Sequence, residues 1–283
     1  MRCLAIFREL TNSPNRENDD ALILKAVCDE LVKLGVKVHL IEPEIIDDVL
    51  NEKWDVVIAM CENPHNLNKI RKIDAIFVNP VESVFNCYRV KMYELVNKKC
   101  PDIFPESEIR RMSDFPGKKP DFIDGEGVWV KRGDVHNTCL HDVHYVKKWE
   151  DAVRVKKDFE TRNITDVMIQ KHISGDLIKF YGVGPGKWLD WFYHKPTVAM
   201  KYEFDVNKLH KNAIRFAEAV GVEVYGGDAI ITRDSKIYII DINSWPSFAR
   251  VRDKVKRVIA EHIFNKIAVV NKIGGENESG NKK

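Results

Sequence analysis

The chain has 283 residues, of which 44% are hydrophobic and 31% charged, and its formal net charge is +2. This length allows a large buried core divided among one to three domains, and the composition excludes disordered and fibrous classes. The balance of 45 basic and 43 acidic residues excludes the global positive field that dominates nucleic-acid binding, so any anion site has to be local.

Cysteine usage and the length of the apolar runs indicate the cellular compartment of the protein. The six cysteines are scattered, with no CxxC pair and no histidine at zinc-finger spacing, so neither a disulfide framework nor a zinc finger is indicated. The N-terminus lacks the long apolar region of a signal peptide, and no apolar run approaches the roughly twenty residues of a membrane helix. Nothing in the pattern specifies an oligomeric state. We expect a cytoplasmic protein without a membrane or nucleic-acid partner.

The first eighty residues alternate between two hydrophobic periods. Short β-branched and aromatic runs predict four strands, at 3–9, 36–44, 55–60 and 75–80. Apolar residues at helical spacing predict a helix over 19–35, which ends at Gly35. Because strands and helix alternate, parallel βαβ units are indicated. We expect a small open α/β domain over residues 1–82.

The pattern changes after a connecting helix over 83–100 and a Pro- and charge-rich passage. Longer strands are predicted at 127–133, 166–174, 177–184 and 188–194. Helices are predicted over 150–160, 206–220 and, at the end of the chain, 248–270. A hairpin over 226–243 turns at Arg233-Asp234-Ser235, a composition typical of a tight reversal.

The hairpin carries the most informative polar residues. Asp228 begins its first strand, and Asp241 and Asn243 end its second, so antiparallel pairing brings the three together. Two carboxylates and an amide oxygen are hard ligands that suit Mg²⁺. The alternative is that Asp228 caps a turn and Asn243 forms an Asx turn before Pro246. For the three residues together we favour a metal site.

Two lysines lie within apolar strands of the same region. Lys131 and Lys179 either extend their ammonium groups to water or hold a buried anion such as a triphosphate. Between them an apolar strand passes into Gln170-Lys171-His172-Ile173, whose backbone can meet the edge of a purine; the alternative is an ordinary strand end.

A polar loop after Lys131 contains His136, His141 and His144, with Cys139 between them. A zinc site there would need a fourth ligand. We favour a flexible anion-binding loop, and a solvated loop without a ligand stays open as an alternative.

Together these residues resemble the ATP-grasp superfamily, in which two α+β subdomains hold ATP and the Mg²⁺ ligands lie on the last hairpin. The resemblance implies ATP and Mg²⁺ as cofactors and a fold that combines α/β and α+β parts. It divides the chain into an N-terminal α/β domain, a central subdomain, a C-terminal subdomain with the Mg²⁺ site and a disordered tail, at 1–82, 83–175, 176–272 and 273–283.

Within that superfamily, Asp241-Ile242-Asn243 is similar to the inositol polyphosphate kinases, because most carboxylate–amine ligases carry Glu-x-Asn there. The helix YRVKMYELV and the two-histidine loop resemble the inositol tris/tetrakisphosphate kinase branch. This likeness implies nucleotide contacts for Arg89, Lys131, Gln170, Lys171, His172, Ile173 and Lys179. It implies catalytic roles for Lys179 and Arg250.

The expected activity is phosphoryl transfer from Mg-ATP to a hydroxyl of a small anionic, inositol phosphate-like substrate. The residues expected to bind that substrate are His141, Arg16, Lys187, Arg250 and Arg252. The family's N-terminal lysines have no clear match here, where Arg8 and Arg16 are the substitutes, and Trp245-Pro246-Ser247-Phe248 replaces the family's Gly-containing segment. Two rivals stay open: a ligase of the RimK or glutathione synthetase type, acting through an acyl phosphate, and a nucleotide-binding regulatory module.

Overall fold

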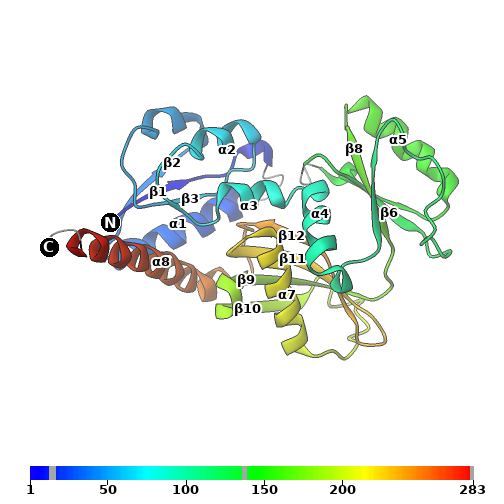
Figure 1. The fold of residues 1–283 in the computed structure, drawn as a ribbon. Coiled ribbons are helices and arrows are strands. Elements are labelled where there is room, and N and C mark those ends of the chain that lie inside the picture. Colours follow the sequence, from blue (N-terminus) through cyan, green and yellow to red (C-terminus); the bar gives the residue numbers. More distant parts are fainter. Residues whose placement is uncertain (13–16, 136–138, 281–283) are drawn as a thin grey trace.

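The computed structural model describes residues 1–12, 17–135 and 139–280, which contain three four-stranded sheets. Figure 1 shows the C-terminal sheet between the N-terminal domain and the central sheet. Short 3₁₀ segments lie at Leu10–Asn12, Pro43–Val49, Pro101–Ile103, Leu140–Asp142 and Trp149–Asp151. Over the described ranges, no helix combines the length and the apolar character needed to cross a membrane.

The N-terminal domain is the parallel sheet that the sequence predicts. Its strands are β1 (Arg2–Ile6), β2 (Lys37–Ile41), β3 (Val56–Ala59) and β4 (Ile76–Phe77), all parallel in the order β2-β1-β3-β4. Helix α1 (Glu17–Lys33) buries one apolar stripe in a core that includes β1 and β3. Helix α2 (Pro64–Ile70) contributes to a second core. Gly35 follows α1 with φ +81°, a left-handed conformation that glycine adopts readily.

The connection expected as one helix over 83–100 consists of two helices, α3 (Val81–Asn86) and α4 (Arg89–Lys99). The helical backbone is interrupted at Tyr88, which is extended with φ −66° and ψ 136°. The Tyr88 hydroxyl donates to the Glu62 carbonyl at 2.6 Å. This hydrogen bond links the interruption between α3 and α4 to the N-terminal domain. Helix α4 then begins at the buried Arg89.

The central sheet is antiparallel, in the order β5-β8-β6-β7. Its strands are β5 (Ser107–Arg111), β6 (Val128–Arg132), β7 (Val143–Val146) and β8 (Asp166–Lys171). The pattern predicted β6 and β8 but missed the other two, because they are short edge strands with only one fully buried residue between them. Helix α5 (Ala152–Thr161) packs on this sheet through Ala152, Val155 and Phe159.

The C-terminal sheet is also antiparallel, in the order β10-β9-β11-β12. Its strands are β9 (Asp176–Val183), β10 (Trp188–Tyr193), β11 (Val224–Ile231) and β12 (Ile237–Ser244), with a four-residue helix, α6 (Gly184–Lys187), between the first two. Helix α7 (Val206–Val220) covers the sheet and matches its predicted range. The predicted hairpin is present, with Ser235 in the turn at φ +62°.

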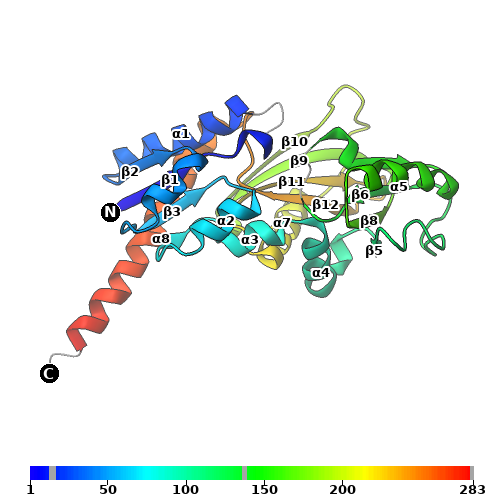
Figure 2. The same cartoon turned by 90° about the horizontal axis from the view of Figure 1, so that it is seen from above.

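The last helix, α8 (Arg252–Gly280), begins later and continues further than the predicted range of 248–270. Trp245 and Phe248 have φ values of +45° and +48°, so the chain turns sharply before the helix can begin. The Trp245 indole donates to the Val78 carbonyl at 2.8 Å. Figure 2 shows α8 running back beside α1, and both contribute to the core of the N-terminal domain. The segment after Asn243 therefore joins the C-terminal sheet to the N-terminal domain.

Candidate active site

One row of side chains crosses the C-terminal sheet. It consists of Phe192 on β10, Lys179 on β9, Asp228 on β11 and Asp241 on β12, each paired with the next. Directly paired residues of antiparallel strands present their side chains on the same face. Lys179 Nζ donates to Asp228 Oδ1 at 2.7 Å. The two predicted carboxylate ligands are therefore direct cross-strand neighbours.

A β-bulge lies beside these carboxylates. Asp228 pairs with Asp241 whereas Ala229 pairs with Ile239, so Ile240 is the extra residue on β12. A bulge locally bends a strand and changes the direction of nearby groups. Here the Ile240 carbonyl lies 3.4 Å from Lys131 Nζ, which belongs to the central sheet. The bulge thus brings the two sheets together next to the carboxylates.

Asn243 lies two residues beyond Asp241 on the same face, opposite Gly226. Its Oδ1 atom is buried and has no hydrogen-bond partner among the described residues. A side chain at position 226 would place Cβ 2.7 Å from the Tyr181 ring and 2.8 Å from Pro246 Cγ, so only glycine fits beside Asn243 without a shift. A buried amide oxygen without a partner beside two carboxylates is a donor set that suits Mg²⁺.

The described residues offer no other cluster for a metal. Within 1–12, 17–135 and 139–280, no three His, Cys, Asp or Glu side chains gather closely enough to hold an ion. The zinc alternative in the histidine loop therefore finds no support from His141, His144 and Cys139, and His136 lies outside those ranges. A magnesium site on the hairpin would need the amide of Asn243 as its third protein ligand.

A cavity of about 530 Å³ lies between the central and C-terminal sheets. The predicted nucleotide residues that line it are Arg89, Lys131, Gln170, Lys171, His172 and Ile173. Trp129, Leu177, Ile230 and Ile240 add apolar walls, and Asp228 and Asp241 lie at its border. An apolar cavity that ends in cations and paired carboxylates suits a nucleotide, because the base needs apolar contact and the phosphates need charge. We call it the nucleotide cavity.

Lys131 is the most perturbed cation of this cavity. Its side chain is only 6% exposed, and its Nζ donates to Gln170 Oε1 at 2.7 Å. Burial, helped by the nearby Arg89 charge, lowers the pKa of Lys131 to about 8, although Asp241 and Asp228 oppose the change. Bound phosphates would supply the negative charge that this buried ammonium lacks. An anion-holding role thus accounts for Lys131 better than extension to water does.

Arg89 enters the nucleotide cavity from the first turn of α4 and is 1% exposed. It donates to the Arg132 carbonyl at 2.8 Å. Burial lowers the pKa of Arg89, and the charges of Asp241 and Asp142 work against that change. A guanidinium stays protonated at physiological pH even so. The cavity therefore contains two buried cations, one from α4 and one from β6.

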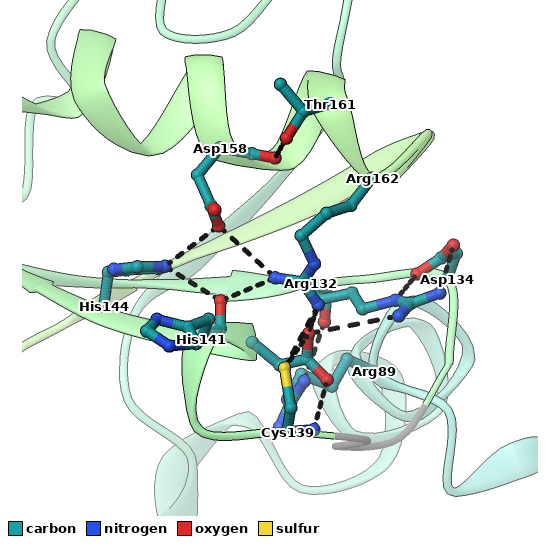
Figure 3. A network of polar contacts seen from close by, with 10 residues as sticks. Arg89, Arg132, Asp134, Cys139, His141, His144, Asp158, Thr161 and Arg162 are labelled. Atoms are coloured by element: carbon teal, nitrogen blue, oxygen red, sulfur yellow. Dashed lines mark hydrogen bonds and ion pairs between the residues drawn. The ribbon is translucent and has the colours of Figure 1, made fainter. Parts of the chain in front are cut away.

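Figure 3 shows the polar network beside Arg89, which includes Cys139, His141 and His144 of the histidine loop. Arg162 pairs with the fully buried Asp142 and donates to the His141 carbonyl at 2.9 Å. The His144 ring approaches the same carbonyl at 2.8 Å. His141 is itself exposed and lines neither this cavity nor the one described next.

A second cavity, of about 240 Å³, lies on the other side of Asp228. Its lining includes Lys179, Tyr181, Phe192, His194, Asn243, Pro246 and Arg250. The Arg250 guanidinium carbon lies 4.4 Å from the centre of the Phe192 ring, which orients it by a cation–π contact. Because Asp228 borders both cavities, a group bound here would lie next to the phosphate end of a nucleotide. We call it the acceptor cavity.

Several basic residues expected at the substrate are placed elsewhere. Lys187 Nζ donates to His262 Nδ1 at 2.9 Å, and Arg252 pairs with Asp19 of α1 at 2.9 Å; neither lines the two cavities. The expectation that they bind the substrate together with Arg250 is wrong. Arg252 lies at the start of α8, which the turns at Trp245 and Phe248 aim at the N-terminal domain, and Lys187 lies in α6, beyond the end of β9. Arg16 lies outside the described residues.

Arg8 is also held away from both cavities. Its guanidinium pairs with Asp20 at 3.0 Å and with Glu62, and it donates to the Trp245 carbonyl at 2.5 Å. These bonds attach the end of β1 to the segment after β12. The structure gives Arg8 an interdomain contact.

Sequence reasoning missed Trp129, Tyr181 and His194, which line the cavities. His194 follows Phe192 at the spacing of one strand face, so alternation along β10 could have indicated it. That signal requires the β9–β10 register, because only pairing with Lys179 shows which face is functional.

Comparisons with known proteins agree on the fold. No family model and no curated sequence matches the chain. Among solved structures, D-alanine–D-alanine ligase from Bacillus anthracis, complexed with ATP, aligns with a TM-score of 0.70 at 11% identity, covering 97% of this chain and 99% of that one. VanG D-Ala:D-Ser ligase from Enterococcus faecalis aligns at 0.66 and 14% identity, covering 88% and 91%. A RimK domain protein ATP-grasp from Sphaerobacter thermophilus aligns at 0.66 and 14% identity, covering 93% and 100%.

These similarities cover 88–97% of the chain. The chain therefore has the ATP-grasp fold, as its hairpin and lysine strands indicated. The structural neighbours are named as ligases or ATP-grasp proteins, and none of them supports the inositol kinase branch.

Proposed function

We propose that the protein is an ATP-dependent carboxylate–amine ligase that works through an acyl phosphate. The observation that carries this proposal is the charge of the acceptor cavity. Among the described residues, its lysine and arginine lining consists of Lys179 and Arg250, and Lys179 is already paired with Asp228. One guanidinium can bind one carboxylate, whereas an inositol polyphosphate needs several cations. The similarity to proteins named as ligases supports the same choice.

The residues of the two cavities have different proposed roles, in binding the nucleotide and in binding the carboxylate. Arg89 and Lys131 bind the phosphates of ATP, and Gln170 to Ile173 line the nucleotide cavity where the base would lie. Asp228, Asp241 and Asn243 would hold Mg²⁺, which would neutralise phosphate charge when bound. Arg250, oriented by Phe192, binds the substrate carboxylate next to Asp228.

In this arrangement Lys179 is the catalytic cation. It is the cross-strand partner of Asp228, which borders both cavities, and this position supports a role at the phosphoryl group that passes from the nucleotide to the carboxylate oxygen. A fixed cation in a partly buried site stabilises the negative charge that develops on the transferring oxygens. The chain supplies position and charge, and no covalent nucleophile is required.

One specific observation favours a second candidate function. Asp241-Ile242-Asn243 is the Asp-x-Asn form that resembles inositol polyphosphate kinases, where the acceptor is a hydroxyl. Both activities use the same nucleotide cavity, so only the acceptor distinguishes them.

The test is product trapping with hydroxylamine. The enzyme is incubated with Mg-ATP, hydroxylamine and, one at a time, amino acids, dipeptides, dicarboxylic acids and inositol phosphates. A ligase releases ADP and forms a hydroxamate with its carboxylate substrate, because hydroxylamine attacks the acyl phosphate. Transfer of γ-label to an inositol phosphate without hydroxamate would overturn the ligase proposal. Asp241→Ala should abolish either product and serves as the control for contaminating activity.

A further inference from the structure

A third cavity, of about 310 Å³, adjoins both of those described above. It shares Gly175 and Leu177 with the nucleotide cavity and His194 with the acceptor cavity, and Lys195 and Val198 add to its lining. The three spaces therefore meet around one part of the sheet. The proposed ligase has three ligands to accommodate, and the two cavities assigned so far hold ATP and the carboxylate.

His194 lies at the junction of the acceptor and third cavities. Its backbone N–H donates to the Leu177 carbonyl at 2.9 Å, which extends the β9–β10 ladder by one residue. Phe192, two residues earlier, is paired with Lys179, so alternation puts the His194 side chain on the same face as Lys179. In the part of the chain that the structure describes, no hydrogen bond or ion pair joins the His194 ring to Asp228.

We infer that the third cavity binds the amine co-substrate and that His194 accepts a proton from it. This inference rests on the proposed ligase function. The attacked acyl carbon would be held by Arg250 in the acceptor cavity, and an amine in the third cavity reaches that carbon past His194. A base has to lie within hydrogen-bond reach of the proton it removes, and His194 is the residue that lines both the acceptor cavity and the third cavity.

Amide formation requires the amine nitrogen to lose two protons. The ammonium form of the amine gives one proton to a neutral ring nitrogen of His194, and the nitrogen lone pair then forms a C–N bond with the acyl carbon. The bond between that carbon and the phosphate oxygen breaks, and phosphate leaves with the electron pair. The second proton lost by the nitrogen goes to the departing phosphate, which leaves an amide, phosphate and a protonated imidazole that returns its proton to water.

The surroundings of His194 favour the neutral ring. Burial lowers the pKa of His194, and the facing cations Lys179 on β9, Lys195 next in the chain and Arg250 before α8 lower it further. Asp228 on β11 acts in the opposite direction. Because the pKa lies below its ordinary value, the imidazole is neutral near neutral pH and one nitrogen can accept a proton.

The lining of the third cavity specifies a class of amine. Lys195 offers an ammonium to a carboxylate, and Leu177 and Val198 offer apolar contact, with Val198 itself 71% exposed. An α-amino acid or a short peptide has an amine, a carboxylate and a side chain, one group for each of these contacts. A plain alkylamine lacks the group that Lys195 would bind.

The experiment compares two nucleophiles in His194→Asn, with the exposed His65→Asn on α2 as the matched control. An amino acid reaches the enzyme as an ammonium and needs a base, whereas hydroxylamine is uncharged at neutral pH and needs none. We expect His194→Asn to lose amide formation about 100-fold or more near neutral pH while hydroxamate formation stays within about twofold of wild type. The lost amide rate should recover as pH rises, because the free amine becomes abundant. His65→Asn should leave both products unchanged.

The other outcomes would overturn the role of His194, the ligase proposal or the assignment of the third cavity. Equal loss of amide and hydroxamate in His194→Asn, or a loss that does not recover with pH, overturns the role of His194. Absence of hydroxamate from the wild-type enzyme with every carboxylate overturns the ligase proposal itself. Lys195→Ala should raise the KM of amino-acid amines and leave that of an alkylamine unchanged; an equal rise for both overturns the assignment of the third cavity. Unchanged unfolding midpoints in urea verify that the variants are folded.

Discussion

The buried ammonium of Lys131 should make the stability of the ligand-free protein depend on pH. The pKa of this group falls from its ordinary 10.5 to about 8 in the folded chain, chiefly because of burial. Below about pH 8 the ammonium is charged in both states, and the folded state alone has the cost of burying it. Between the two pKa values the folded state has released the proton and the unfolded state still binds it, so stability rises with pH.

The size of the effect follows from the two pKa values. One pKa unit corresponds to about 1.4 kcal/mol, so the charged Lys131 destabilises the folded state by about 3 kcal/mol near pH 7. At about pH 9.5 the same linkage leaves a destabilisation of the folded state of about 1.4 kcal/mol. Lys131→Met removes this pH-dependent part. It also leaves Gln170 Oε1 without its lysine donor, a cost of about 1–3 kcal/mol that does not vary with pH.

The assay is urea unfolding of wild type and Lys131→Met at several pH values between neutrality and about pH 9.5. We expect the difference in free energy of unfolding to move by about 2 kcal/mol in favour of wild type as pH rises, whatever its value at neutrality. Lys147→Met, which changes an exposed lysine, should give a constant difference. A constant difference for Lys131→Met as well would refute the buried charge. Mg-ATP should reduce the pH dependence of wild type, because phosphates stabilise the ammonium.

Three further predictions concern the site and its supports. Arg250→Ala should raise the KM of the carboxylate by about 10-fold or more with little change for ATP, whereas Lys187→Ala should change neither; equal effects of the two would contradict the acceptor cavity. Asp241→Ala should lower Mg²⁺-dependent ADP formation by about 100-fold or more without changing the unfolding midpoint, and undiminished turnover would exclude its metal role. Trp245→Phe leaves the Val78 carbonyl without its indole donor and should reduce the free energy of unfolding by about 1–3 kcal/mol; an unchanged value in urea would show that this contact does not stabilise the domain junction.

Local patterns were sufficient for the elements that carry them strongly. The apolar periodicity of α7, capped by Asp205 and ended by Gly221, predicted its limits to the residue. The alternation of the last hairpin predicted that Asp228 and Asp241 lie close together, but the turn alone would pair Asp228 with Ile240, and the bulge at Ile240 is what brings Asp241 opposite Asp228. Edge strands β5 and β7 were missed because half-buried polar residues give no periodic signal.

The basic residues after Asn243 show that residues close in sequence can lie in different parts of the structure. Arg250 and Arg252 are two residues apart, yet one stacks on Phe192 in the acceptor cavity and the other pairs with Asp19. Arg250 lies in the turn before α8 and Arg252 is the first residue of that helix, so their side chains leave the chain in different directions. The left-handed backbone at Trp245 and Phe248 precedes this turn, and no residue pattern indicates such a conformation in non-glycine residues.

The amino-acid sequence by itself determined the hairpin that carries Asp228 and Asp241, the lysines within apolar strands and the parallel N-terminal domain, since each depends on contacts that hydrophobic period and turn chemistry specify locally. Only the tertiary structure decided which cations share a cavity with those two carboxylates. That outcome depends on how three sheets pack against one another, which buried Lys131 beside the β12 bulge, directed Arg252 to α1 and brought His194 to the point where three cavities meet.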